Sequence, residues 1–459
     1  IMRSFAPLSL CSFALVLIQA YASKPSGIIT PTPTSQIIEW EGKPDDPSLA
    51  ADNTDTLNSA LASLTPGSTL HIPNNTYWLT GGVYASDLVD ATIQLDGTLM
   101  FSKGRRGWPT EDCKNDKTKA CVKKAILIEN VKGLTLTSSS GGGGGMVDGN
   151  GESWWGYINY LIHSEDRPKL LTIYNATDVL VEDWHFRQAA YHTFHADDVA
   201  RVEIRRCSVD NRVSHRDNHS PVNLRALNTD GFDVSGKDIY IHDCEVWNQD
   251  DCFTIVPTTA SGINSQCTEN ILVENIKASG LGLTIGSIKP TSNHACIKNI
   301  TFRNAYMSNT YKGVYMKSAA SDDPDATAEV TDILYENITM DKPEQVPIWI
   351  GPAQEADSNN ACSLAWPKIK RANCPAPHPG MAWTNITLRN ILVKDSRVSP
   401  GIVFGNEDSP MEAVVFDNVV FEPADEDAKP WGEDFYYCKG VNGVAMGGTT
   451  PVPPCFESK

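Results

Sequence analysis

The chain has 459 residues, of which 41% are hydrophobic and 20% are charged, so it is long enough to bury a large core. Its formal net charge of −18 lacks the basic footprint that binds nucleic acid or anionic membranes, and we expect neither as a partner. We expect an acidic monomer.

The N-terminus has the features of a secretory signal peptide. Arg3 precedes an apolar run at 8–18, and the small-residue pattern Ala20-Tyr21-Ala22 follows. A membrane anchor is the alternative, but the run is shorter than the roughly 20 residues that a bilayer span needs. We predict that residues 1–22 are removed, that the protein is secreted, and that residues 23–459 form one domain.

A glycine run and several N-glycosylation sequences also stand out in the sequence. The glycine run at 141–145 predicts a flexible turn, and because no helix start follows it we assign it no phosphate-binding role. Sequences that allow N-glycosylation of a secreted protein occur at Asn74, Asn175, Asn218, Asn299, Asn337 and Asn385.

From residue 179 onward an eight-residue phrase returns along the chain. Each phrase alternates apolar and polar residues, breaks at a polar pair such as EN, RN or DN, and then resumes with an apolar position, which reads as strand, bend, strand. The phrases are VLVEDWHF (179–186), VEIRRCSV (202–209), IYIHDCEV (239–246), ILVENIKA (271–278), ITFRNAYM (300–307), ILYENITM (333–340), ITLRNILV (386–393) and VVFDNVVF (414–421).

These repeats predict an all-β fold, a parallel β-helix in a single elongated domain, because β repeats with almost no helical periodicity between them stack into coils. A β-sandwich or propeller would need hairpin turns at regular intervals, and the sequence offers few. The long interval at 341–385 is predicted to be a loop excursion that could wall a cleft.

The cysteines suit an oxidising compartment. Short-range spacing predicts the disulfides Cys113–Cys121, Cys252–Cys267, Cys362–Cys374 and Cys438–Cys455, which leaves Cys296 without a partner. Cys207 and Cys244 occupy the same place in successive phrases, and we expect buried thiols there. Ligand spacing typical of zinc sites is missing, so we expect no zinc.

Acidic residues crowd around the phrase at 239–246. Asp230 precedes it, and Asp250 and Asp251 follow it, so about one turn of the solenoid separates the two clusters. Stacked coils would bring these three carboxylates together on one face. Glycoside hydrolysis needs such a set: one carboxyl donates a proton to the leaving oxygen, and another activates water, with about 6.5–9.5 Å between acid and base in an inverting enzyme.

Calcium binding is the main alternative for this cluster. The flanking residues Phe232, Cys252 and Phe253 offer no further oxygen ligands, so we expect neither a metal nor another cofactor. Asp233 is assigned to structure, bonding backbone amides of the bend.

Several polar side chains are candidates for sugar binding. Asn228 and Gln249 neighbour the acids, and His192 and His195 lie on a preceding coil, where they either line the cleft or cap the stack. Lys317 is assigned to a substrate subsite together with Tyr315. The remaining candidate is Gln354, for which a loop role is the expectation.

The sequence resembles glycoside hydrolase family 28, the polygalacturonases and rhamnogalacturonases. The resemblance rests on MVDGNGESWW (146–155), NTDGFD (228–233), QDDC (249–252), GLGLTIGS (280–287) and GVYMKS (313–318), in order, and extends over about 40–425. It implies a right-handed β-helix, extracellular hydrolysis of pectin backbones in plant cell-wall polysaccharide, and inversion. It also implies Asp250 as general acid, with Asp230 and Asp251 activating water.

Two departures from the polygalacturonase pattern bear on the substrate. Leu281 stands where these enzymes have the histidine of GHG, and Tyr315 stands where they have the arginine of RIK, the side chain best suited to grip a carboxylate. A less acidic or branched pectic substrate is therefore expected. A β-helix polysaccharide lyase and a non-catalytic pectin-binding relative are the alternatives.

Overall fold

The structure is a computed structural model that describes residue 29 and residues 35–459, except 114–115, 140–143, 157–165, 213–224, 259–261, 263, 265, 355–361, 364–365, 367–372, 397–398 and 424–435. The predicted signal peptide at 1–22 and the glycosylation sequence at Asn218 lie outside this part of the chain, as does most of the glycine run. No helix among the described residues is long and apolar enough to cross a membrane.

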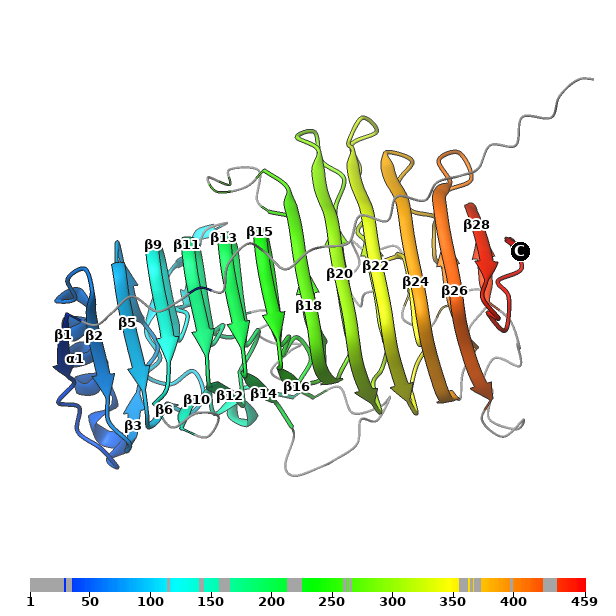
Figure 1. The fold of residues 1–459 in the computed structure, drawn as a ribbon. Coiled ribbons are helices and arrows are strands. Elements are labelled where there is room, and N and C mark those ends of the chain that lie inside the picture. Colours follow the sequence, from blue (N-terminus) through cyan, green and yellow to red (C-terminus); the bar gives the residue numbers. More distant parts are fainter. Residues whose placement is uncertain are drawn as a thin grey trace, which may run out of the picture.

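The fold is a right-handed parallel β-helix, which confirms the prediction. Figure 1 shows its coils side by side along one axis, in sequence order from blue to red. All but two of the described strands belong to one sheet of 27 strands. The sheet is wound so that equivalent strands of successive coils stack in three parallel ladders, which we call lines.

The first line contains most of the longest strands, each paired in parallel with the equivalent strand of the next coil. It comprises β1 (Gln36–Glu39), β2 (Ser68–Ile72), β5 (Val89–Leu95), β9 (Ile126–Thr137), β11 (Leu171–Glu182), β13 (Phe194–Arg205), β15 (Phe232–His242), β18 (Thr268–Ser279), β20 (Ala295–Ser308), β22 (Ala328–Asp341), β24 (Met381–Ser396), β26 (Met411–Pro423), β28 (Val441–Met446) and β29 (Phe456–Ser458).

The other two lines follow from bends in these strands. The second comprises β3 (Thr76–Leu79), β6 (Thr98–Phe101), β10 (Gly145–Asp148), β12 (Trp184–Arg187), β14 (Ser208–Asp210) and β16 (Glu245–Trp247), and continues in the second halves of β18 to β26. The third begins with β4 (Val83–Ser86) and the first residues of β9 to β15, and continues as β17 (Asp251–Ile255), β19 (Gly282–Ile288), β21 (Val314–Ser318), β23 (Ile348–Pro352), β25 (Gly401–Phe404) and β27 (Tyr437–Lys439).

The bend in each predicted phrase is made by its fifth residue. All eight of these residues have a positive φ, between 51° and 59°: Asp183, Arg206, Asp243, Asn275, Asn304, Asn337, Asn390 and Asn418. Asn and Asp tolerate this left-handed conformation better than other residues with a side chain. The asparagines also form a ladder, in which each side-chain amide donates to the amide oxygen of the preceding coil, as from Asn337 to Asn304 at 3.2 Å.

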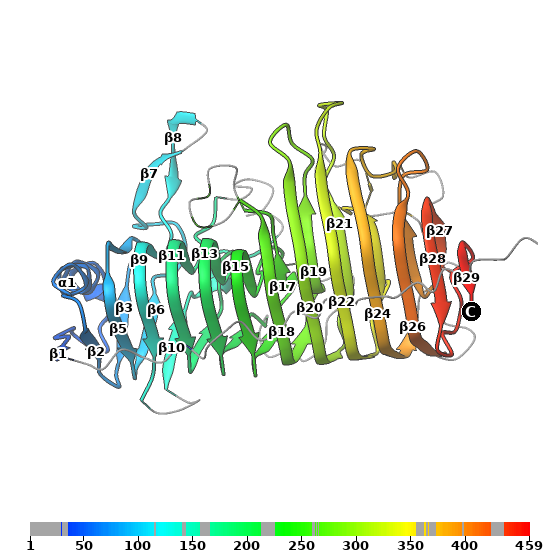
Figure 2. The ribbon, with the colours of Figure 1, turned by 45° about the horizontal axis from the view of Figure 1, so that its top comes forward.

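Three features lie outside the repeat and were not predicted. The helix α1 (Ala50–Ala62), preceded by a 3₁₀ turn η1 (Pro47–Leu49), covers the N-terminal end of the stack (Figure 2). A second 3₁₀ turn, η2 (Gly151–Ser153), follows β10. The antiparallel strands β7 (Thr110–Cys113) and β8 (Asp116–Val122) project from the body (Figure 2).

The interval at 341–385 is not one loop, because β23 lies within it. The excursion runs from 353 to 380, between β23 and β24.

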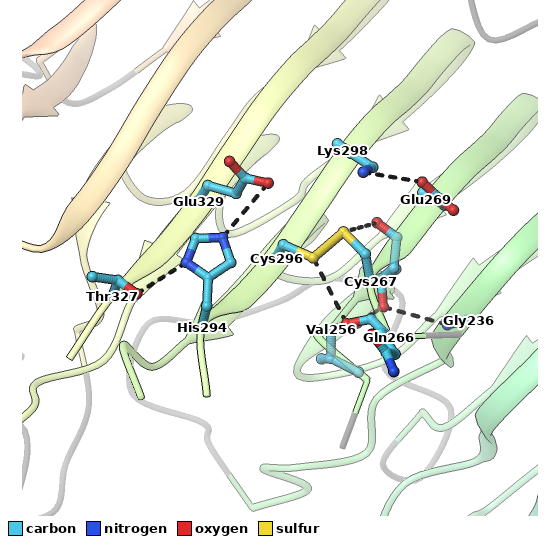
Figure 3. Close-up of a disulfide and its surroundings, with 11 residues drawn as sticks. Gly236, Val256, Gln266, Cys267, Glu269, His294, Cys296, Lys298, Thr327 and Glu329 are labelled. Carbon is cyan, nitrogen blue, oxygen red and sulfur yellow. Dashed lines mark hydrogen bonds and ion pairs between the residues drawn. A yellow bond between two sulfur atoms is a disulfide. The ribbon is translucent and has the colours of Figure 1, made fainter. Parts of the chain in front are cut away.

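Three of the four predicted disulfides are present, Cys113–Cys121, Cys362–Cys374 and Cys438–Cys455. The prediction that Cys267 pairs with Cys252 and leaves Cys296 free was wrong: Cys267 bonds to Cys296 (Figure 3). Parallel pairing of β18 with β20 sets the two residues level on neighbouring coils, whereas Cys252 lies in the buried strand β17. Cys207 and Cys244 are buried thiols, as predicted.

Candidate active site

Asp230, Asp250 and Asp251 come together where β15 and β17 begin. The two strands pair in parallel, with Phe232 opposite Phe253, and the Gly231 N–H donates to the Asp251 carbonyl at 2.9 Å. The structure thus brings the two acidic clusters onto one site, with one oxygen of each carboxyl within 4.8 Å of the others. This spacing of the nearest oxygens is closer than the expected 6.5–9.5 Å between acid and base.

Asp250 is held by backbone donors and is nearly buried, at 8% exposed. Its Oδ2 accepts the N–H of Asn228 at 2.9 Å, and its Oδ1 accepts the N–H of Asp251 at 2.9 Å. Burial and the charge of Asp251 raise the pKa of Asp250 to about 6, although Lys317 and the two N–H groups act in the opposite direction. The carboxyl can therefore keep a proton under mildly acidic conditions.

Asp251 has a partner on each oxygen. The Lys317 ammonium of β21 lies 2.7 Å from Oδ2, and the Thr284 hydroxyl of β19 donates to Oδ1 at 2.7 Å. Burial opposes the charge on Lys317, but Asp251 outweighs it and raises the pKa of the lysine well above its ordinary value. Lys317 thus reaches the acids, and Thr284, which the sequence analysis missed, fixes the other side of Asp251.

Asn228 and Gln249 are tied to the chain segments around the acids by hydrogen bonds. The Oδ1 of Asn228 accepts from Arg167 Nη2 at 3.5 Å, and Arg167 also donates to the carbonyls of Ala190 and Leu227. Gln249 is 2% exposed, and its Oε1 accepts the Ala226 N–H at 2.9 Å. Arg167 was not predicted, because it lies outside every motif and meets Asn228 only through the fold.

Tyr315 lies between two lysines, with Lys312 Nζ and Lys317 Nζ each 4.8 Å from its ring centre. Its ring is buried and packs edge-on against Trp349 of the next coil. Lys312 donates to Gln345 Oε1 at 2.8 Å, and burial together with Lys317 lowers the pKa of Lys312 to about 7. Lys312 was not predicted, because no motif distinguishes it from an ordinary surface lysine.

The excursion after β23 adds aromatic residues over this part of the sheet. Trp366 lies 5.9 Å from Trp349 and 4.9 Å from Tyr437, ring centre to ring centre. Gln354 Nε2 donates to the Trp366 carbonyl at 2.6 Å, so its amide group holds the loop, as expected of a loop residue.

His192 and His195 face Asp233 on the neighbouring coil. His192 Nδ1 lies 2.6 Å from Asp233 Oδ2, His195 Nδ1 lies 3.8 Å from the same oxygen, and His192 Nε2 lies 3.9 Å from Asp230 Oδ1. The assignment of Asp233 to backbone amides was wrong: Oδ2 faces the imidazoles, and Oδ1 has no hydrogen-bond partner among the described residues. His192 therefore connects Asp233 to the acids.

Two groups of side chains meet the distance requirement of a metal site, namely the three acids and the set of His192, His195 and Asp233. In the first group the Lys317 ammonium already stands beside Asp251.

Comparison with known proteins gives consistent results. The family model described as "Glycosyl hydrolases family 28" matches residues 65–430. "Probable rhamnogalacturonase B" of Aspergillus oryzae is 25% identical over 426 residues, covering 90% of this chain and 65% of that protein. "Endo-xylogalacturonan hydrolase A" of Aspergillus tubingensis is 25% identical over 296 residues, covering 64% of this chain and 65% of that protein. The chain thus spans about two thirds of the length of these relatives.

Solved structures share the fold. The polygalacturonase from Erwinia carotovora ssp. carotovora superposes with a TM-score of 0.63 at 16% identity, over 90% of this chain and 97% of that one. The endo-xylogalacturonan hydrolase from Aspergillus tubingensis gives a TM-score of 0.58 at 21% identity, over 92% and 99%. Since the family match extends across most of the β-helix and includes the coils that hold the three aspartates, the chain belongs to the glycosyl hydrolases of family 28.

Proposed function

We propose that this protein is a secreted hydrolase of pectic polysaccharide, with Asp250 as general acid and with Asp230 and Asp251 holding the attacking water. The observation that supports this most directly is the set of three nearly buried carboxyls with one oxygen each within 4.8 Å. Like charges at this spacing keep at least one carboxyl protonated, as acid catalysis requires.

The roles of the three acids follow from their partners. Asp250, with its pKa raised to about 6, holds a proton for the leaving oxygen. One water that donates to two oxygens at about 2.8 Å each, with a tetrahedral angle, needs them roughly 4.6 Å apart, and an oxygen of Asp230 lies within 4.8 Å of one of Asp251, close enough for one water to bridge them.

Inversion is proposed rather than retention because Asp251 is poorly placed to attack the sugar. Both of its oxygens are engaged, one by Lys317 and one by Thr284. A carboxylate held in this way can orient a water, but it must give up a partner to form a bond to the anomeric carbon.

A rhamnogalacturonan or xylogalacturonan chain is the proposed substrate class. Tyr315 offers a buried ring where polygalacturonases have a guanidinium, and Lys317 is already paired with Asp251. Relatives named for rhamnogalacturonan and xylogalacturonan support the same choice.

The test compares homogalacturonan, rhamnogalacturonan and xylogalacturonan with the wild type, Asp250→Asn, and a control, Asp322→Asn, which changes an exposed carboxyl. We expect hydrolysis of a pectic chain, a loss of about 10²- to 10⁴-fold in kcat for Asp250→Asn with binding retained, and no loss for the control. NMR of the first-formed anomer should show inversion. Unsaturated products would instead indicate a lyase, and unchanged activity of Asp250→Asn would remove the proposed acid.

A further inference from the structure

His192 stands between two aspartates that belong to different parts of the site. It precedes β13, while Asp230 and Asp233 lie at the start of β15 on the next coil. Each ring nitrogen faces one carboxylate: Nδ1 is 2.6 Å from Asp233 Oδ2, and Nε2 is 3.9 Å from Asp230 Oδ1. The three side chains therefore form a line that ends at the oxygen proposed to activate water.

The Asp230 oxygen at the end of this line is buried and has no hydrogen-bond partner in the described part of the chain. A buried carboxylate oxygen without a donor is costly, whereas a proton on that carboxyl removes most of the cost. Burial and the charges of Asp233, Asp250 and Asp251 raise the pKa of Asp230 well above its ordinary value. The resting carboxyl thus favours the protonated form, which cannot serve as a base.

His192 is neutral in the same resting state. Burial lowers its pKa to about 4, although Asp233 opposes this shift, while Lys169 and His195 add to it. Burial would also disfavour a charge on Asp233, but His192 outweighs it and lowers the pKa of that aspartate. Among the described residues, the imidazole is faced by Asp230 and Asp233 from the start of β15, His195 from β13 and Lys169 from the segment before β11. The ring of Tyr191 lies 4.0 Å away, centre to centre, tilted by 30°, and Arg167 lies over it.

We propose that His192, oriented by Asp233, is the positioning residue that accepts the proton of Asp230 and so makes this carboxylate available as the base. This role rests on the proposed hydrolase function and differs from the substrate contact expected from sequence. Leu281 replaces the histidine that polygalacturonases have in their GHG motif. His192 supplies the site with an imidazole from a different coil.

The proton balance closes over one turnover. When substrate binding brings Nε2 and Oδ1 together, the Asp230 proton moves to His192 Nε2, against the order of the two resting pKa values, and the imidazolium that forms faces the charge of Asp233 at Nδ1. The attacking water then forms its bond to the anomeric carbon and gives a proton to Asp230, while Asp250 gives its proton to the leaving oxygen as the glycosidic bond breaks. His192 finally returns its proton through solvent to Asp250, which restores the starting state. The 3.9 Å between Nε2 and Oδ1 requires a small approach of the two groups when substrate binds, as is common for catalytic contacts in unliganded enzymes.

The experiment uses His192→Gln and Asp233→Asn, with His294→Gln as the matched control, because His294 is an exposed histidine whose partners are Thr327 and Glu329, outside the acid–base cluster. We expect both test variants to lose roughly tenfold to hundredfold in kcat with KM within about twofold, and the acid limb of kcat/KM against pH to move up by roughly one pH unit, because Asp230 must then release its proton to solvent. The control should keep the wild-type profile. A rise in KM with an unmoved limb would overturn the proposal in favour of simple substrate contact.

A second measurement does not depend on activity. In protein with labelled histidine, the NMR titration of His192 in the wild type should differ from that in Asp230→Asn, since removing the neighbouring acid removes the shared proton. Identical His192 titrations would overturn the proton exchange even if the hydrolase function holds, whereas a wild type inactive on every pectic chain would remove the function and leave this coupling measurable.

Discussion

Thr284 offers a sharp test of how the site holds Asp251. Its hydroxyl, fully buried in β19, donates to Asp251 Oδ1 at 2.7 Å. Thr284→Val keeps the shape of the side chain and removes only this donor. A hydrogen bond to a charged group contributes about 1.5–3 kcal/mol, and each 1.36 kcal/mol is tenfold in rate, so we expect kcat/KM on the accepted pectic substrate to fall by roughly tenfold to a hundredfold.

The neighbouring coil provides a matched control. Thr254 lies directly opposite Thr284 in β17 and is also buried, but its hydroxyl has no hydrogen-bond partner among the described residues. Thr254→Val should therefore leave kcat/KM unchanged and leave the melting temperature equal or slightly raised, since it replaces an unsatisfied buried hydroxyl by a methyl group. Initial rates and thermal unfolding of the three proteins check this. Equal losses in both variants would show that packing, rather than the bond to Asp251, explains the effect.

Two further predictions concern stability. His71 bridges the carboxylates of Glu39 and Asp96. Burial opposes a charge on His71, but the bonds to the two carboxylates outweigh it and raise the pKa of the imidazole. The bridge therefore stabilises the fold most below about pH 6.5 and is lost as the pH rises through the folded-state pKa. The melting temperatures of wild type and His71→Gln should accordingly converge between roughly pH 5.5 and 8. A constant difference would contradict this. Cys296→Ser should lower the free energy of unfolding by about 3–4 kcal/mol, because the bond to Cys267 closes a loop of 29 residues. Cys252→Ser breaks no disulfide and should lower this free energy by less. Denaturant titrations measure both losses, and the reverse order would contradict the observed pairing.

The β-helix could be predicted because its determinants are local. Each phrase contains its own strands and its own bend, and the fifth residue of every phrase adopts the positive φ that Asn and Asp accept most readily. The same phrase length on successive coils then sets asparagines such as Asn304 and Asn337 level with each other. The sequence pattern therefore predicts the structure correctly for the strands and bends, whose geometry depends on residues of a single coil.

The parts that were missed depend on how different coils are aligned. Cys267 bonds to Cys296 rather than to Cys252, which is nearer in sequence. The reason is that β18 and β20 are adjacent strands, whereas Cys252 is a buried thiol in β17. Arg167 reaches Asn228 across 61 residues of sequence, and no spacing rule connects them. The meeting of Asp230 with Asp250 and Asp251 could be anticipated because a single coil separates them.

The charges of the site give a physical reason for the proposed substrate class. One ammonium, Lys317, lies against Asp251, and the next cation, Lys312, is buried behind Tyr315 with a pKa of only about 7. A sugar carboxylate about 5 Å from one of the acids would add a repulsion of roughly 3 kcal/mol at an effective dielectric constant of about 20, and Tyr315 offers no positive charge to offset it. A neutral or substituted sugar avoids this cost. We infer that the change from arginine to Tyr315 shifts the preference at this subsite away from free galacturonate while the acid–base machinery stays in place.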